Sequence, residues 1–198
     1  MEGPVTGFLE QSVIRRVARL LKTGGIAVLP TDTLYGFHCV FSAAGSIERI
    51  RTLKGKRGKG GFILLASDIT MVDRLVSRWP PGVREHLAAV WPATLTAILH
   101  ASPQLPPILV RRDSVAVRVP AHDGLRSLVA CVGQPLVSTS VNRTGEEPLR
   151  SIAGIRDSFP GLDAYISRRG RGGSLPSTVI SFTVKPPRTV RAGRYPVT

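Results

Sequence analysis

The sequence predicts an α+β (mixed α/β) protein in which helices pack on a twisted sheet of mixed parallel and antiparallel strands. Short apolar runs typical of buried strands alternate along the chain with segments of helical periodicity. This alternation is too regular for an all-α or an all-β protein. A length of 198 residues suits one domain with a substantial core, and no linker divides the chain. We therefore expect a single domain over residues 1–198.

The first elements are a helix, a strand and a second helix. Apolar residues fall on one helical face over Glu10–Lys22, and a glycine pair ends the segment. The apolar run Ile26–Leu29 predicts a buried strand. A short helix over Ser46–Leu53 then leads into a basic, glycine-rich loop.

The middle of the chain continues the alternation. Phe62–Ala66 predicts a second buried strand. Two helical segments follow, Thr70–Arg78 and Gly82–Val90, with a proline pair between them. The runs Leu95–His100 and Val115–Val119 predict further strands.

The last part of the chain repeats the pattern with shorter elements. We expect a helix over His122–Val132, a strand over Leu136–Ser138 and a helix over Ile152–Ser158. Strands are expected at Ala164–Ile166 and Thr178–Phe182.

The composition is strongly basic. Twenty-seven lysines and arginines against thirteen acidic residues give a net charge of +14. Such an excess favours encounter with polyanions, among which nucleotides, tRNA and an anionic membrane surface all qualify, and it also serves simply to keep a protein in solution. No apolar run is long enough to cross a bilayer, no secretory signal is visible, and Cys39 and Cys131 read as buried free thiols. We therefore expect a cytoplasmic protein without a membrane partner.

The segment LPTDTLYG, residues 29–36, places hydroxyls at the end of a buried strand. Ligands of α/β sheets usually bind at strand ends, where Thr31 and Thr33 could donate to a carboxylate or phosphate. Thr31 and Asp32 could equally serve only to complete the turn by bonding nearby backbone groups.

The segment RIRTLKGKRGKGG, residues 49–61, crowds lysines and arginines beside glycines. A glycine-rich loop lets the backbone approach a polyphosphate while residues such as Lys54, Lys56 and Arg57 neutralise its charge. The spacing is not that of a Walker A loop. We favour anion binding here over a solvated basic loop.

Three further segments offer polar side chains. In PLVSTSVNRTGEEP, Ser140 and Asn142 could contact a base, ribose or phosphate, or could fix a turn. Arg118 stands inside an apolar strand, where it needs a carboxylate or phosphate partner, supplied by a ligand or by a structural ion pair. Ser177 opens the last apolar run, and Arg191 lies near the C-terminus.

The sequence contains no metal-ligand cluster and no obvious catalytic nucleophile or base. The four histidines are scattered, and we expect each to be a surface or packing residue rather than a general base: His38, His86, His100 and His122. A site rich in hydroxyls and cations suits phosphoryl or nucleotidyl transfer, where positioning and charge neutralisation dominate.

In their order and spacing these segments resemble the YrdC-like family, and in length the short, single-domain (TsaC-type) form. The resemblance covers roughly residues 14–193 and is carried by GGIAVLPTDTLYGF, ERIRTLKGKRGKGGFILLA, VWPATLTAIL, VAVRVPAH, LVSTSVNRTGEEP and LPSTVISF. It implies a YrdC-like fold and threonylcarbamoyl-AMP synthase activity. In that reaction L-threonine, bicarbonate and ATP, with Mg²⁺, give threonylcarbamoyl-adenylate and pyrophosphate.

The resemblance also implies partners and site residues. The product would serve t6A37 modification of tRNA, completed by downstream tRNA threonylcarbamoyl-transferase proteins, and the basic surface would contact tRNA or another RNA. The threonine site would comprise Thr31, Thr33, Arg118 and Ser177. The ATP site would comprise Lys54, Lys56, Ser140, Asn142 and Arg191. We add Arg57 to this site, because it would supply from the neighbouring position the guanidinium that the family has in place of Lys56.

The basic loop departs from the family pattern. Lys56 stands where the family has arginine, and Arg57 stands where it has proline. Lysine and arginine differ in bidentate phosphate recognition. Two other functions therefore stay open, namely a non-synthase paralogue that binds RNA and a carbamoyl transferase acting on another small molecule.

Overall fold

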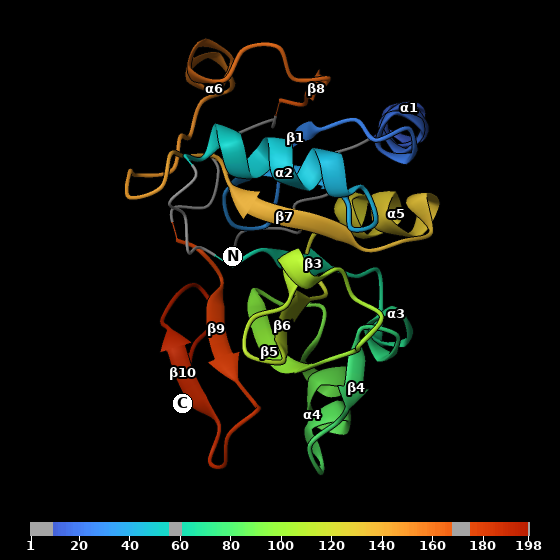
Figure 1. The fold of residues 1–198 in the computed structure, drawn as a ribbon, viewed down its shortest axis with the longest axis vertical. Helices are drawn as coiled ribbons and strands as arrows, with labels where there is room; N and C mark the ends of the chain where they lie inside the picture. The colour runs from blue at the N-terminus through green and yellow to red at the C-terminus, as the bar shows by residue number, and fades with distance from the viewer. Residues whose placement is uncertain (1–9, 56–60, 168–174, 198) are drawn as a thin grey trace, which may run out of the picture.

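The computed structural model describes residues 10–55, 61–167 and 175–197. Within these ranges ten strands form one sheet in the order β10-β9-β5-β6-β3-β7-β2-β1-β8, with β4 pairing with the end of β5 (Figure 1). The strands are β1 (Ala27–Pro30), β2 (Tyr35–Val40), β3 (Ile63–Leu65), β4 (Val76–Arg78), β5 (Leu95–Ala101), β6 (Ser114–Arg118), β7 (Leu136–Ser140), β8 (Ala164–Tyr165), β9 (Thr178–Ser181) and β10 (Arg188–Arg191). The helices are α1 (Gln11–Lys22), α2 (Ala44–Leu53), α3 (Ile69–Asp73), α4 (Val83–Val90), α5 (Asp123–Val132) and α6 (Ile152–Ser158), with a 3-10 helix at Pro107–Leu109.

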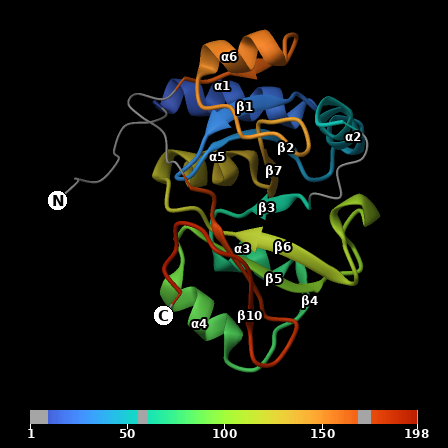
Figure 2. The same ribbon diagram turned by 90° about the vertical axis from the view of Figure 1, so that its left-hand side faces the viewer.

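The sheet is mixed, as the sequence predicts. The pairs β1–β8, β3–β6 and β5–β9 are parallel, and the other neighbours are antiparallel. Helices pack on both of its faces near β1. Leu29 of β1 lies in one core cluster with apolar residues of α1 and α5, whereas Val28 lies in the other cluster with residues of α2. Figure 2 shows the same arrangement from the side.

Short-range interactions set the helix boundaries. The His122 side chain accepts a hydrogen bond from the backbone N–H of Leu125 and so caps the start of α5. Gly133 ends this helix in the left-handed region, with φ of 77°. The Ser151 side chain caps α6 in the same way as His122 caps α5, by accepting from the N–H of Gly154.

The structure corrects several expectations. The predicted helix Thr70–Arg78 is wrong beyond Asp73, because Val76–Arg78 forms β4 and pairs with the free end of β5. The strands β2 and β10 have no counterpart in the sequence prediction. Cys131 is exposed rather than buried, while Cys39 is buried.

The C-terminal segment forms the edge of the sheet opposite β1 and β8 and then contacts the loop that follows β1. Strand β9 runs parallel to β5, and the residues after β10 lie near the loop that follows β1. There, Arg194 Nη1 donates to the backbone oxygen of Asp32 at 3.0 Å. The ends of β1, β6 and β7 and the start of β9 therefore meet in one region. None of the described helices has both the length and the apolar character required to span a bilayer.

Candidate functional site

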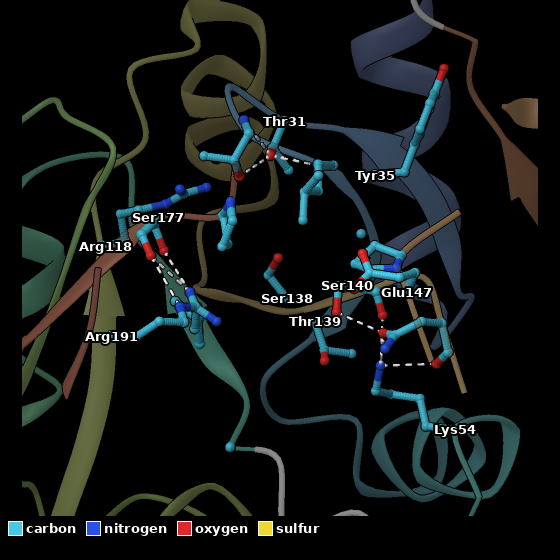
Figure 3. Close-up of a pocket in the computed structure, with 18 of the residues that line it drawn as sticks. Thr31, Tyr35, Lys54, Arg118, Ser138, Thr139, Ser140, Glu147, Ser177 and Arg191 are labelled. Carbon is cyan, nitrogen blue, oxygen red and sulfur yellow. Dashed lines mark hydrogen bonds between the residues drawn. The ribbon is translucent and has the colours of Figure 1, made fainter. Parts of the chain in front are cut away.

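A cavity of about 520 Å³ lies where these strand ends meet (Figure 3). Its lining includes every predicted site residue that the structure describes, namely Thr31, Thr33, Lys54, Arg118, Ser140, Asn142, Ser177 and Arg191. The other two predicted residues, Lys56 and Arg57, lie outside the described residues. Side chains separated by up to 160 positions in the sequence are thus gathered around one space.

Thr31 and Thr33 lie in the turn after β1, where hydrogen bonds fix the direction in which the Thr31 hydroxyl donates. Thr31 Oγ1 donates to the backbone oxygen of Leu34 at 2.8 Å and accepts from the N–H of Thr33 at 3.0 Å. The two threonine hydroxyl oxygens are 2.9 Å apart. Since the single proton of Thr31 is used at Leu34, Thr33 donates to Thr31, and the Thr33 oxygen keeps acceptor capacity. The turn and the cavity wall are therefore built from the same residues.

Arg118 forms a buried ion pair with Asp32. Arg118 Nη2 lies 2.9 Å from Asp32 Oδ1, and the two side chains are 4% and 8% exposed. Asp32 Oδ2 accepts from the N–H of Ala121 at 2.9 Å. Burial lowers the pKa of Arg118, and the charge of Asp32 opposes that shift. Arg118 Nε has no hydrogen-bond partner among the described residues, so the guanidinium has donor capacity left over.

Ser177 and Arg191 form the wall opposite Lys54. Ser177 Oγ is 2.8 Å from the buried hydroxyl of Thr96. Arg191 Nη2 donates to the backbone oxygen of Ser177 at 2.9 Å and lies 3.2 Å from its hydroxyl. These bonds tie β10 to the start of β9 and hold the Arg191 charge at the cavity.

Lys54 follows the last residue of α2 and is anchored to the loop after β7. Its Nζ donates to the backbone oxygen of Ser140 and to Asn142 Oδ1, each at 2.7 Å. Ser140 Oγ also donates to Asn142 Oδ1, at 2.7 Å. Burial lowers the pKa of Lys54 to about 8. Lys54 is therefore not part of a fully solvated basic loop, which was the alternative to anion binding.

The charge of the cavity is predominantly positive. Lys54, Arg118, Arg150 and Arg191 line it, and among the described residues of the lining Glu147 is the one carboxylate. No group of three or more His, Cys, Asp or Glu that could hold a metal ion occurs in the described part of the chain. Mg²⁺ usually combines one or two carboxylates with substrate phosphates. The lining is therefore compatible with a Mg²⁺ ion that arrives on phosphates, and Glu147 is the carboxylate that could contact such an ion.

Sequence reasoning missed some residues of the site. Asp32 reads as a turn residue, and only the fold reveals it as the partner of Arg118. Glu147 and Arg150 belong to a polar loop with no distinguishing pattern. Ser138 stands in the hydroxyl cluster of β7 without a signal that sets it apart. His38 is fully buried, as a packing residue would be, yet it contacts the cavity-lining Ser138.

Comparisons with known proteins agree on one family. The family model described as "Telomere recombination", whose name combines Sua5, YciO and YrdC, matches residues 19–193. A threonylcarbamoyl-AMP synthase of Nitrosococcus oceani is 36% identical over 154 residues, which are 77% of this chain and 83% of that protein. A protein of the same name from Chromobacterium violaceum is 33% identical over 91% of this chain and 94% of its own length.

A solved structure gives the same result. The crystal structure of P. abyssi Sua5 complexed with L-threonine superposes with a TM-score of 0.85 at 27% identity. The match covers 93% of this chain and 55% of Sua5, so this chain corresponds to just over half of that protein.

Proposed function

The chain belongs to the Sua5/YciO/YrdC family, and from that premise we propose that it is a threonylcarbamoyl-AMP synthase. This nucleotidyltransferase condenses L-threonine, bicarbonate and ATP to threonylcarbamoyl-adenylate and pyrophosphate. The observation that carries the proposal is the cavity itself. It joins a buried arginine with spare donor capacity to a lysine-anchored polar loop, within one space of about 520 Å³.

We assign the threonine site to the wall formed by Thr31, Thr33, Arg118 and Ser177. The guanidinium of Arg118 would bind the carboxylate, because a planar fork suits two oxygens. Acceptor capacity on the Thr33 oxygen suits the ammonium or hydroxyl of the amino acid. Thr31 would act by holding Thr33 in place. The P. abyssi Sua5 structure complexed with L-threonine supports this choice of ligand.

We assign the ATP site to the wall formed by Lys54, Ser140, Asn142 and Arg191, extended by Lys56 and Arg57. Lys54 and Arg191 would neutralise the phosphates, and Ser140 and Asn142 would position the nucleoside. Mg²⁺ bound with ATP would rest against Glu147 and help the leaving pyrophosphate carry its charge.

The reaction needs positioning more than a covalent enzyme intermediate. The threonine amine, in its uncharged form, attacks carbon dioxide and loses a proton to give a carbamate; where bicarbonate is the source, water leaves as the nitrogen–carbon bond forms. A carbamate oxygen then attacks the α-phosphorus, and the bond between the α-phosphorus and the bridging oxygen breaks as pyrophosphate leaves. The two walls would bring these groups together, and the cations would stabilise the charge that develops.

The direct test is pyrophosphate release from ATP in the presence of Mg²⁺ and bicarbonate. We expect release that depends on L-threonine and is much weaker with serine or valine. A mass spectrum should show threonylcarbamoyl-adenylate as the product. Absence of threonine-dependent release from a folded protein would reject the synthase assignment.

The proposed function also implies partner molecules. The product would be used on tRNA in the cytoplasm by threonylcarbamoyl-transferase proteins. A net charge of +14 favours contact with tRNA, and it is also the observation that supports a second candidate function, RNA binding by a non-synthase paralogue.

A further inference from the structure

His38 and Ser138 are direct cross-strand partners beneath the cavity. Strands β2 and β7 pair antiparallel with His38 opposite Ser138. The two side chains therefore extend from the same face of the sheet, and His38 Nε2 lies 3.2 Å from Ser138 Oγ. His38 is 0% exposed, and Ser138, at 8%, lines the cavity. The histidine is therefore shielded from solvent, and its side-chain hydrogen bond toward the cavity goes to the serine.

Gly36 provides the space for this pair. A Cβ atom at position 36 would come within 2.8 Å of His38 Cε1 and within 3.2 Å of Ser138 Oγ. Any residue larger than glycine would therefore displace the ring or the hydroxyl. The backbone of Gly36 therefore packs directly against the contact between His38 and Ser138.

The tautomer of the ring decides which way the serine hydroxyl points. Burial lowers the pKa of His38 to about 4, against the opposing effect of backbone hydrogen bonds at Gly36 and Ala27, so the imidazole is neutral at physiological pH and has one N–H. Nε2 faces the serine oxygen. A proton on Nε2 is donated to Ser138 Oγ and leaves the serine proton available to the cavity, whereas a bare Nε2 would accept that proton.

Ser138 occupies the middle of the cavity. Figure 3 shows it between the group formed by Ser177 and Arg191 and the group formed by Ser140 and Lys54. In the proposed function these groups hold threonine and ATP, so the carbamate and the α-phosphate would meet beside Ser138. Both are anionic, and a hydroxyl next to them must donate its proton.

We propose that His38 is a positioning residue, which donates from Nε2 to Ser138 Oγ and thereby directs the Ser138 proton toward the reacting anions. Ser138 is then a catalytic donor whose orientation is fixed before the substrates arrive. The inference rests on the proposed function for the identity of those anions. The tautomer and the hydrogen bond do not depend on it.

The first test is a ¹⁵N–¹H NMR spectrum of the wild-type protein without substrates. We expect His38 to show a protonated Nε2 and a bare Nδ1 at pH 7. This spectrum is expected even if the protein proves to have no synthase activity, because it is recorded without substrates. A protonated Nδ1, or an imidazolium, overturns the proposal. This readout separates failure of the proposal from failure of the synthase assignment.

The second test compares His38→Leu with His38→Gln, whose amide can donate from nearly the position of Nε2. We expect His38→Leu and Ser138→Ala each to lower kcat by about 10- to 100-fold with little change in the KM for threonine. His38→Gln should restore most of the loss, whereas His86→Gln, the same exchange on α4 outside the cavity, should change nothing.

The proposal also requires that the effect of His38 substitutions on kcat depends on the Ser138 hydroxyl. In the Ser138→Ala background, His38→Leu and His38→Gln should have equal kcat values. Unequal values, or a failure of glutamine to restore activity in a variant that melts like the wild type, would show that His38 serves packing alone.

Discussion

Lys54 is a structural anchor to which the proposed function also gives a phosphate-binding role. Its Nζ holds Ser140 and Asn142 by hydrogen bonds, and burial lowers its pKa to about 8. Lysine is charged below its pKa, so the phosphate-binding form is lost as the pH rises through 8. We predict that kcat/KM for ATP falls above pH 8 with an apparent pKa near that value.

The control for this prediction is Lys54→Arg, which stays charged over the whole range. Its absolute activity should be lower, but the decline above pH 8 should disappear. A decline that persists in this variant would assign the ionisation to another group.

Arg118 has a structural role that its sequence pattern leaves open. Its substitution by alanine leaves the buried Asp32 carboxylate without its partner. We predict that Arg118→Ala lowers the free energy of unfolding by about 3–5 kcal/mol and raises the KM for threonine. Urea unfolding and initial-rate kinetics measure the two effects.

The double variant Arg118→Ala/Asp32→Ala separates them. Stability should recover in part, because the unpaired charge is gone, while the threonine requirement stays high. Recovery of both properties would place the threonine carboxylate elsewhere.

His38 makes a prediction about acid stability. The unfolded chain protonates this histidine below its ordinary pKa of 6.5, whereas the folded protein resists until about 4. The unfolded state therefore binds more protons in this window, and stability falls as the pH drops from 6.5 to 4, by roughly 3 kcal/mol for this group. His38→Gln should remove that component of the slope in urea titrations at several pH values. An unchanged slope would contradict it.

At the scale of elements, the β9–β10 pair depends on a close backbone contact. A Cβ at Gly193 would lie 2.4 Å from the backbone oxygen of Pro176 and 2.5 Å from the carbonyl carbon of Ser177. We predict that Gly193→Ala pushes the segment after β10 away from Ser177, displaces Arg191 and raises the KM for ATP several-fold. The matched control is Gly45→Ala in α2, where nothing lies within 4 Å of the added Cβ and the helix should gain up to about 1 kcal/mol. Equal kinetics for the two variants would exclude the contact as a determinant of the site.

The helices and strands differ in how well the local sequence pattern predicts their position and type. Helix α6 begins and ends where the sequence predicts, because the Ser151 cap and the apolar spacing agree. Strand β4 could not be predicted, since Val76–Arg78 continues a helical pattern and becomes extended only by pairing with β5. Strand β10 is exposed throughout and has no buried face to produce a pattern. Strand β2 is buried at every position and follows a turn signal directly.

At the scale of the whole molecule, the net charge bears on RNA binding, whereas the topology bears on which side chains meet at the cavity. The net charge of +14 is a property of composition, and it predicts tRNA binding whose affinity falls steeply with salt. If about six phosphates are contacted, the affinity should fall about 10³-fold between 50 and 200 mM salt in filter-binding measurements. A flat response would leave the charge without a role in RNA binding.

Contacts between side chains of segments far apart in the sequence could not be predicted from the sequence alone. The hydroxyl and cation clusters were visible individually, and the family resemblance predicted that they share a pocket. The Arg118–Asp32 pair and the His38–Ser138 contact depend instead on strand register and burial, which no local spacing encodes.

The bond between Arg194 and the backbone of Asp32 joins residues 162 positions apart. During synthesis the Thr31–Thr33 turn leaves the ribosome long before Ser177 and Arg191 do. A nascent chain can therefore form α1 and the β1–β2 hairpin early, but the cavity lacks one wall until Ser177 and Arg191 have emerged. The cavity is completed, in time as well as in space, by the segment that contains β9 and β10.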